Sequence, residues 1–212
     1  MSSRPRTAFV LSGGASLGAL QVGMLRALYE RGITADLLVG TSVGALNAAF
    51  VASRSQTPAT ARALARVWRG VERGDAFPLS LRAVAGGLAG RRDQPISQAV
   101  ELGAERIYVL STREPSCPQV NPPRTALDAA ICGISLLMGS RLESDVGRYG
   151  REAELIVLPA PNAIQVQPTD FDHSSELTAT AYSAARDALA GADTFRETPL
   201  AAGSAQRLAA VG

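Results

Sequence analysis

The sequence predicts an α/β protein of three layers, α/β/α, in which helices cover both faces of a mainly parallel central sheet. Short apolar runs typical of buried strands alternate along the chain with longer segments of helical periodicity. A glycine-rich turn also follows each of the first two apolar runs. Because helices separate the consecutive strands, the strands should run parallel.

The expected elements follow one another in the order that this architecture needs. Strands are predicted over residues 7–11, 36–40, 106–111 and 154–158. Helices are predicted over residues 19–31, 43–53, 58–70, 95–102, 125–149 and 175–190. The helix at 58–70 has a broad apolar face, formed by Ala61, Leu64, Ala65, Val67 and Trp68. Loops or short turns are expected over residues 75–90 and in the proline-rich connector from Pro115 to Pro123.

The predicted helix at 125–149 carries an apolar stripe at helical spacing. The stripe consists of Ile131, Ile134, Leu137, Met138 and Leu142. Such a stripe usually packs in the core. The alternative is a partly exposed acyl-chain groove or a dimer face, where the flexible Met138 would adapt to a lipid tail or a partner.

The composition agrees with a single soluble domain. With 212 residues, 46% of them hydrophobic and 19% charged, the chain can bury a sizeable core. We expect one domain over residues 1–195 and an Ala/Gly-rich tail over residues 196–212. A net charge of +2 and an aromatic content of 5% argue against nucleic-acid binding. The small excess of positive charge, which arginine supplies, permits at most contact with anionic lipid head groups.

The cysteines and the apolar runs indicate in which cellular compartment the protein is expected. Cys117 and Cys132 give no metal-ligand spacing and do not indicate a disulfide, which favours a reducing interior. No run approaches the roughly 18 apolar residues that a membrane span needs. A cleaved signal segment is not expected, because glycines interrupt the N-terminal apolar run and cleavage would remove the first glycine turn. These features predict a cytoplasmic protein, and peripheral contact with a membrane stays open.

The segment Gly40-Thr41-Ser42-Val43-Gly44 ends the second apolar run and opens a segment of helix formers. This G-x-S-x-G spacing is typical of a nucleophile elbow, a sharp strand-to-helix turn that exposes a serine. Gly40 and Gly44 are then the elbow glycines, because only glycine lets the neighbouring backbone pack that closely. The alternative is a tight turn in which Ser42 merely caps the helix.

The first glycine turn, from Ser12 to Gly18, follows the strand at 7–11. Its backbone N–H groups can converge on a developing oxyanion, which is what a serine nucleophile needs. A dinucleotide loop is disfavoured, because the glycine spacing differs from G-x-G-x-x-G and Asp36 stands at the start of the next strand, not at its end. A Walker-type loop is excluded, because no G-K-[ST] is present. An oxyanion loop or a plain turn remains.

Three segments carry a family resemblance, namely SGGASLGALQVGML at 12–25, GTSVGALNAAF at 40–50 and QPISQAVELGAERIYVL at 94–110. Together they resemble the patatin-like phospholipase family of lipid acyl hydrolases. The resemblance implies a patatin-like fold and a Ser/Asp dyad that works without histidine. Ser42 would be the nucleophile, and the backbone N–H groups of Gly13, Gly14 and Ala15 would form the oxyanion hole. The family loop usually has a third glycine and then a basic residue, where this chain has Ala15 and Leu17.

The dyad aspartate that the resemblance implies belongs to an Asp-Gly-Gly or Asp-Gly-Ala turn, and this sequence contains no Asp-Gly pair. Asp93 stands only two residues before Pro95, too close to be that aspartate. We favour the interpretation that a segment carrying the aspartate is missing between Asp93 and Gln94. The alternative is a shortened relative without catalytic activity.

A Ser-His-Asp triad would have to use His173, the only histidine of the chain. A histidine near the end follows the chain order of α/β-hydrolases. Its setting, Phe171-Asp172-His173-Ser174-Ser175-Glu176, equally fits a loop that enters a helix with Asp172 or Ser174 as cap. A glycine turn that precedes the serine at the very N-terminus favours the patatin-like dyad.

These observations predict a serine esterase that hydrolyses acyl esters of lipids or phospholipids, in the manner of a phospholipase A, without a metal or other cofactor. A lipid or acyl ester, and no nucleic acid, would be its partner. Two alternatives stay open. One is an acyltransferase with the same elbow, which would need an arginine for a carboxylated acyl group and a histidine beside the serine. The other is a catalytically inactive lipid-binding or regulatory relative.

Overall fold

A computed structural model describes residues 4–71, 95–112, 133, 144–161, 166–168 and 170–197 of the chain. Its centre is a parallel sheet of four strands in the order β2-β1-β3-β4. The strands are β1 (Thr7–Leu11), β2 (Leu37–Gly40), β3 (Arg106–Leu110) and β4 (Glu154–Leu158). Leu11 at the end of β1 is paired with Gly40 on one side and with Leu110 on the other. The carboxyl ends of these three strands therefore meet at one edge of the sheet.

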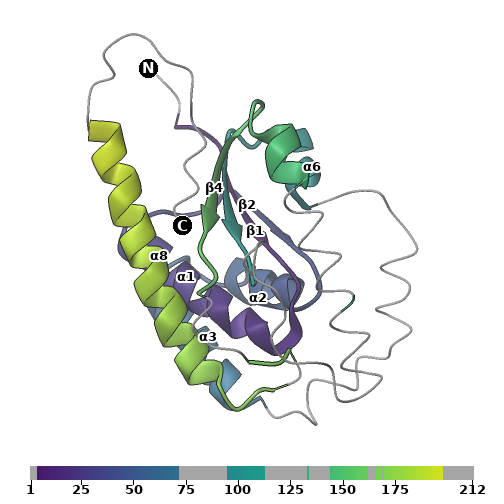
Figure 1. The fold of residues 1–212 in the computed structure, drawn as a ribbon, viewed down its shortest axis with the longest axis vertical. Coiled ribbons are helices and arrows are strands. Elements are labelled where there is room, and N and C mark those ends of the chain that lie inside the picture. The colour runs from purple at the N-terminus through teal and green to yellow at the C-terminus, as the bar shows by residue number, and fades with distance from the viewer. Residues whose placement is uncertain are drawn as a thin grey trace.

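Helices cover both faces of the sheet (Figure 1). One face carries α1 (Gly18–Glu30), α2 (Val43–Ala52), α3 (Pro58–Arg69) and α8 (Ser174–Glu197). The other carries α6 (Pro95–Glu101) and the helical residues 144–149. Side chains alternate along β1, so that Phe9 and Leu11 join the first core whereas Ala8 and Val10 join the second. The predicted three-layer α/β/α fold with a parallel sheet is confirmed.

Helices α1 and α8 cross at Gly23, where their backbones come close together. A Cβ atom at Gly23 would lie 2.2 Å from the Thr178 carbonyl oxygen and 2.6 Å from the Tyr182 nitrogen. The Thr178 hydroxyl donates a hydrogen bond of 3.1 Å to the Ala19 carbonyl, and the Tyr182 hydroxyl donates one of 2.6 Å to Glu30 Oε2. Helix α1 is thus held between the sheet and α8.

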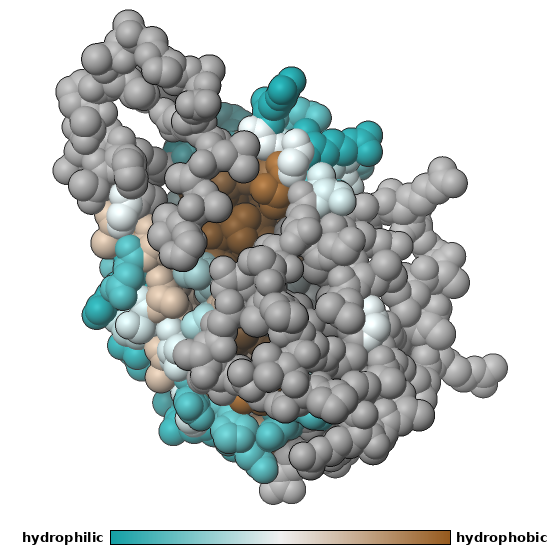
Figure 2. Space-filling view, in the orientation of Figure 1, coloured by the Kyte–Doolittle hydropathy of each residue, from teal (hydrophilic) through white to brown (hydrophobic). Residues whose placement is uncertain are grey.

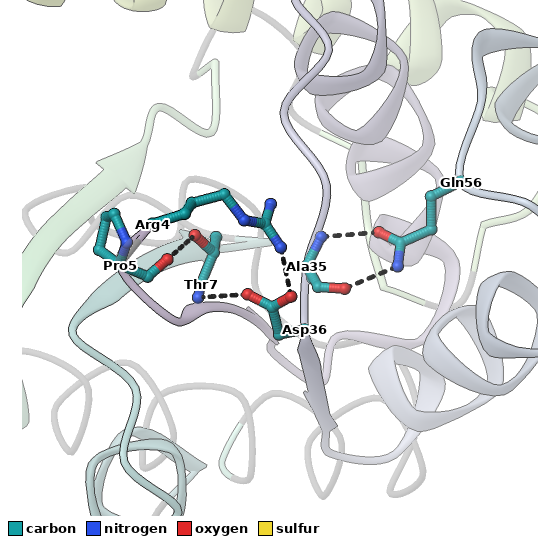
Figure 3. A network of polar contacts seen from close by, with 6 residues as sticks. All are labelled: Arg4, Pro5, Thr7, Ala35, Asp36 and Gln56. Carbon is teal, nitrogen blue, oxygen red and sulfur yellow. Dashed lines mark hydrogen bonds and ion pairs between the residues drawn. The ribbon is translucent and has the colours of Figure 1, made fainter. Parts of the chain in front are cut away.

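Asp36 has a structural role at the amino end of β2, as Figure 3 shows. Its carboxylate accepts a hydrogen bond of 2.9 Å from Thr7 N and forms an ion pair with Arg4. Beside it, the Gln56 amide donates to the Ala35 carbonyl and accepts from the Ala35 N–H, each at 2.8 Å. These contacts join the starts of β1 and β2 at the sheet edge opposite the glycine turns, so Asp36 does not lie where a ribose-binding acid would.

The expected strands and helices within the described residues are present, and most ends shift by only one or two residues. Helix α8 is the exception, because it continues to Glu197 and so includes the start of the tail predicted over 196–212. Its sequence is rich in alanine, and the one glycine inside it costs only about 1 kcal/mol, which is too little to end the helix.

Several predicted features lie outside the described residues. They are the loop at 75–90, the connector at 115–123, the apolar stripe of the helix at 125–149, both cysteines, the Asp93–Gln94 junction and residues 198–212.

Strand β4 borders the described sheet, and its side chains are less buried than those of β1 and β3. Val157 is 39% exposed, and Figure 2 shows apolar surface where Figure 1 draws β4. Another segment or molecule can pack on such a strand. No helix in the described part of the chain has the length and apolar character to cross a membrane.

We expect Gly23→Ala to destabilise the protein by about 1–3 kcal/mol, because the new methyl group meets backbone atoms of α8 that cannot rotate away. Gly191→Ala in α8 is the matched control, since among the described residues no atom outside its own stretch of helix lies within 4 Å of a Cβ at that position. It should stabilise the helix by about 0.5–1 kcal/mol. Urea unfolding measures both changes. Equal stability of the two variants would contradict the close crossing of α1 and α8.

Candidate active site

Two loops meet at the carboxyl edge of the sheet, residues 12–17 after β1 and residues 41–42 after β2. Strands β1 and β2 are hydrogen-bonded neighbours, and Thr41 N extends the pairing with a bond of 3.0 Å to the Leu11 carbonyl. The edge where parallel strands end is where open α/β sheets bind their ligands. The two sequence motifs that predicted a site are therefore neighbours in space.

Ser42 occupies a strained turn between β2 and α2. Its φ of 54° and ψ of −125° lie outside the backbone regions that residues with a side chain normally adopt. Ser42 stands at the N-cap position of α2, but its side chain makes no capping hydrogen bond. The residue is exposed, and its hydroxyl has no hydrogen-bond partner among the described residues. Among the described contacts, Ser42 therefore does not cap α2 through its side chain.

The two glycines of the G-x-S-x-G motif lie against backbone atoms. A Cβ atom at Gly40 would be 2.6 Å from both the Ala45 nitrogen and the Gly44 carbonyl oxygen. At Gly44 it would be 2.3 Å from the Leu11 carbonyl oxygen and 2.5 Å from that of Ser12. Backbone atoms cannot move aside as a flexible side chain can, so neither position accepts a larger residue. Gly40 lets α2 fold back on β2, and Gly44 lets α2 touch the end of β1.

The loop after β1 presents three consecutive backbone amides. Gly13 and Gly14 are buried, and Ala15 has a positive φ of 51°, which is unusual for a residue with a side chain. Within the part of the chain that the structure describes, the N–H groups of these three residues donate to no acceptor. Successive free amides next to a left-handed residue resemble the concave donor sets that bind anions.

The end of this loop is anchored by the segment that precedes α8. The Ser16 N–H donates a hydrogen bond of 3.0 Å to the Pro168 carbonyl, and the Ser16 hydroxyl donates one of 3.1 Å to the Gln167 carbonyl. Ser16 is only 1% exposed and belongs to the 3₁₀ turn Ala15–Leu17 that leads into α1. The loop is thus held by residues that follow it by about 150 positions in the sequence.

Three buried side chains behind the two loops, Gln21, Asn47 and Trp68, were not predicted as part of the site. They come from α1, α2 and α3 and are 0%, 2% and 6% exposed. The Trp68 indole N–H donates to Asn47 Oδ1 at 3.0 Å, and Asn47 Nδ2 donates to Gln21 Oε1 at 2.8 Å. The signal that could have identified the two amides is a polar residue inside an apolar helical run.

His173 stands just before α8 and faces two carboxylates. Its Nδ1 lies 3.2 Å from Glu176 Oε2, and its Nε2 lies 3.5 Å from Asp170 Oδ2. The side chain is 46% exposed, and none of the hydrogen bonds between described residues joins it to Ser42. These contacts agree with the interpretation of a loop that enters a helix.

The fold and the site together define an α/β protein with helices on both faces of a parallel sheet and a strained serine turn beside a glycine loop. The chain belongs to the patatin-like phospholipase family, whose model matches residues 9–202. The resemblance stated from the three sequence segments is therefore confirmed.

Much larger proteins contain segments similar to part of this chain. It is 49% identical over 57 residues to patatin-like phospholipase domain-containing protein 7 of Rattus norvegicus, a match that covers 26% of this chain and 4% of that protein. It is 46% identical over 50 residues to a triacylglycerol lipase of Arabidopsis thaliana, covering 24% and 6%. It is 51% identical over 43 residues to a lysophospholipase of Aspergillus terreus, covering 20% and 3%. The matches span only a small fraction of each relative.

We expect Gly44→Ala to destabilise the protein by about 1–3 kcal/mol, because its methyl group would overlap the carbonyl oxygens at the end of β1. Gly70→Ala is the matched control, since the nearest described atom to a Cβ there, other than those of its chain neighbours, is the Val67 carbonyl oxygen at 3.6 Å. It should change the free energy of unfolding by no more than about 0.5 kcal/mol. Chemical denaturation of both variants checks this, and an undisturbed Gly44→Ala protein would argue against the close contact of α2 with β1.

Proposed function

We propose that this protein is a serine hydrolase of acyl esters and that lipids or phospholipids are its substrates. Ser42 is the nucleophile of this proposal, Gly40 and Gly44 form its elbow, and the N–H groups of residues 13–15 are the oxyanion hole. The observation that carries the proposal is a strained, exposed and uncapped serine beside three amides without acceptors. Membership of the patatin-like phospholipase family supports it.

In the proposed reaction, Ser42 Oγ attacks the ester carbonyl carbon while a general base takes its proton. The carbonyl oxygen becomes an oxyanion, which the three amides stabilise. The bond to the alcohol then breaks, the alcohol leaves with the proton, and an acyl-serine remains. Water attacks this intermediate, releases the fatty acid and restores the serine. Preorganised donors favour the charged intermediate because they need no reorientation when the charge forms.

The general base of this scheme is an aspartate that the described residues do not supply. We place it in the segment proposed to be missing between Asp93 and Gln94, as the family's dyad requires. We also propose that the protein is cytoplasmic and, because its proposed substrates are lipids, contacts a membrane peripherally. The name of the Arabidopsis relative, a triacylglycerol lipase, and that of the Aspergillus relative, a lysophospholipase, agree with a lipid ester as substrate.

The second candidate function is lipid binding or regulation without catalysis. The observation that favours it is the complete absence of an Asp-Gly pair from the sequence. An acyltransferase is less well supported, because it would need a histidine beside the serine and the described contacts of His173 are with Asp170 and Glu176.

Substitutions at Ser42 and His173 test the proposed dyad. Ser42→Ala should lower the rate of hydrolysis of a soluble aryl ester and of phospholipid vesicles by about 10⁴-fold or more, because the nucleophile is removed. His173→Ala should keep the rate within a few-fold, since it changes only a surface contact. Initial rates measure both, and thermal unfolding of each variant shows that it is folded.

Each of the other possible results would show that a different part of the proposed mechanism is wrong. A folded His173→Ala protein that has lost activity would replace the dyad by a triad. Turnover by folded Ser42→Ala would refute the nucleophile. A wild-type protein that binds phospholipid vesicles but hydrolyses no ester, and that a fluorophosphonate does not label, would establish the non-catalytic alternative.

A further inference from the structure

Each of the three peptide groups that carry the amides of Gly13, Gly14 and Ala15 is held by its carbonyl oxygen. The Ser12 carbonyl accepts a hydrogen bond of 2.7 Å from Gln21 Nε2. The Gly13 carbonyl accepts one from the Thr112 hydroxyl. The Gly14 carbonyl accepts one of 3.1 Å from the N–H of Leu17. Two of the three carbonyls are thus fixed by side chains.

A hydrogen bond to a peptide carbonyl also fixes the N–H of the same peptide group. The group is planar and, throughout this structure's described residues, trans, so that its C=O and N–H point in opposite directions. A donor on the carbonyl side therefore sets the direction of the amide on the other side. It also polarises the peptide group, which makes the N–H a stronger donor.

The Gln21 side chain cannot turn away from this position, because its whole amide is engaged. It is fully buried, and Nε2 donates a second bond of 3.2 Å to the Leu110 carbonyl at the end of β3. Its Oε1 accepts from Asn47 Nδ2, which also donates at 3.0 Å to the Gly18 carbonyl. If the Gln21 amide rotated by half a turn, its Nε2 would face Asn47 Nδ2, and both of these groups are donors.

Trp68 fixes the orientation of Asn47 in turn, because its indole N–H can only donate and must face Asn47 Oδ1. The orientation of the Gln21 amide is therefore dictated from α3 through α2. All of these groups are buried. Breaking one hydrogen bond would leave a buried polar atom without a partner, which costs free energy. The complete set of hydrogen bonds is therefore favoured.

Thr112, two residues beyond the end of β3, holds the next peptide group. It is 5% exposed, its N–H donates a bond of 2.9 Å to the Ser12 hydroxyl, and its Oγ1 lies 3.2 Å from the same hydroxyl. A Cβ atom at Gly14 would lie 2.5 Å from Thr112 Oγ1, so the glycine is needed for the threonine to reach the Gly13 carbonyl.

We propose that Gln21 and Thr112 are positioning residues of the oxyanion hole, which aim the amides of Gly13 and Gly14 by holding the Ser12 and Gly13 carbonyls. Asn47 and Trp68 keep Gln21 in place. This inference rests on the proposed hydrolase function. Gln21 and Thr112 act through the loop and do not themselves touch the substrate.

The test compares variants that remove one donor at nearly constant shape, Gln21→Met and Thr112→Val, with Thr112→Ser, which keeps the hydroxyl. Removing an oxyanion donor typically costs about 10²–10³-fold in kcat, and a misaligned donor should cost less, about 10–100-fold. We expect kcat on a soluble aryl ester to fall by that factor with KM within about three-fold, and Thr112→Ser to restore it.

Two further measurements distinguish misdirected amides in the oxyanion hole from a general loss of stability. An alkyl trifluoromethyl ketone, which forms a tetrahedral adduct with a serine nucleophile, should bind more weakly by the same factor as the loss in kcat/KM. The amide resonances of Gly13 and Gly14 in a ¹H–¹⁵N spectrum should move. Thr180→Val is the matched control, because it removes a hydroxyl bond of 2.9 Å to the Glu176 carbonyl within α8, and no hydrogen bond between described residues joins Thr180 to the loop. It should leave kcat, ketone affinity and both resonances unchanged.

The inference is overturned if folded Gln21→Met and Thr112→Val keep wild-type kcat and ketone affinity, or if Thr180→Val lowers them equally. If Gln21→Met does not fold, Thr112→Val and Thr112→Ser decide alone, since the first replaces only the hydroxyl of threonine by a methyl group and the second removes only its methyl group. Failure of the hydrolase function itself is recognised separately, because the wild-type protein would then show no turnover that depends on Ser42, and the oxyanion role would fall with it.

Discussion

The close contact of α2 with the end of β1 is the constraint on which the site depends. Gly44 touches the carbonyl groups of Leu11 and Ser12, and this is possible only because β1 and β2 pair in parallel with Leu11 opposite Gly40. The contact places the start of α2 directly against the end of β1, where the glycine loop begins. Any side chain at position 44 would push α2 away from β1, and Ser42, the proposed nucleophile, would move away from the amides of the glycine loop.

Behind this contact, the layer of helices is joined by polar groups as well as by apolar packing. The chain of bonds from Trp68 through Asn47 to Gln21 runs across α3, α2 and α1 and ends on two carbonyls at the sheet edge. Apolar contacts tolerate small shifts between helices, whereas a buried amide with all its donors engaged tolerates few. The network therefore fixes the positions of these helices relative to one another. It thereby also fixes the position of the glycine loop, which is bonded to them.

The parts of this structure that sequence patterns predict are those set by neighbouring residues. The strands, the helix starts and the turn at Ser42 follow from apolar runs and glycine spacing, which are local. The partners of Gln21 are not local, because Asn47 and Leu110 lie 26 and 89 positions away. A single buried amide in an apolar helix indicates that a partner exists without naming it, and Thr112 carried no signal at all. Helix α8 is longer than the predicted helix at 175–190, because its alanine-rich sequence continues the helix past its one glycine to Glu197.

Backbone strain links the two halves of the site. Among the described residues, Ser42 and Ala15 are the two non-glycine residues with positive φ, and they lie in the two loops that meet at the sheet edge. Each such conformation costs on the order of 1–3 kcal/mol and persists only where the surroundings leave no alternative. At Ser42 the surroundings are the two glycine contacts, and at Ala15 they are the bonds of Ser16 to the segment before α8. Because both strained residues depend on packing from distant parts of the chain, the serine turn and the glycine loop can form only when the whole layer of helices is in place.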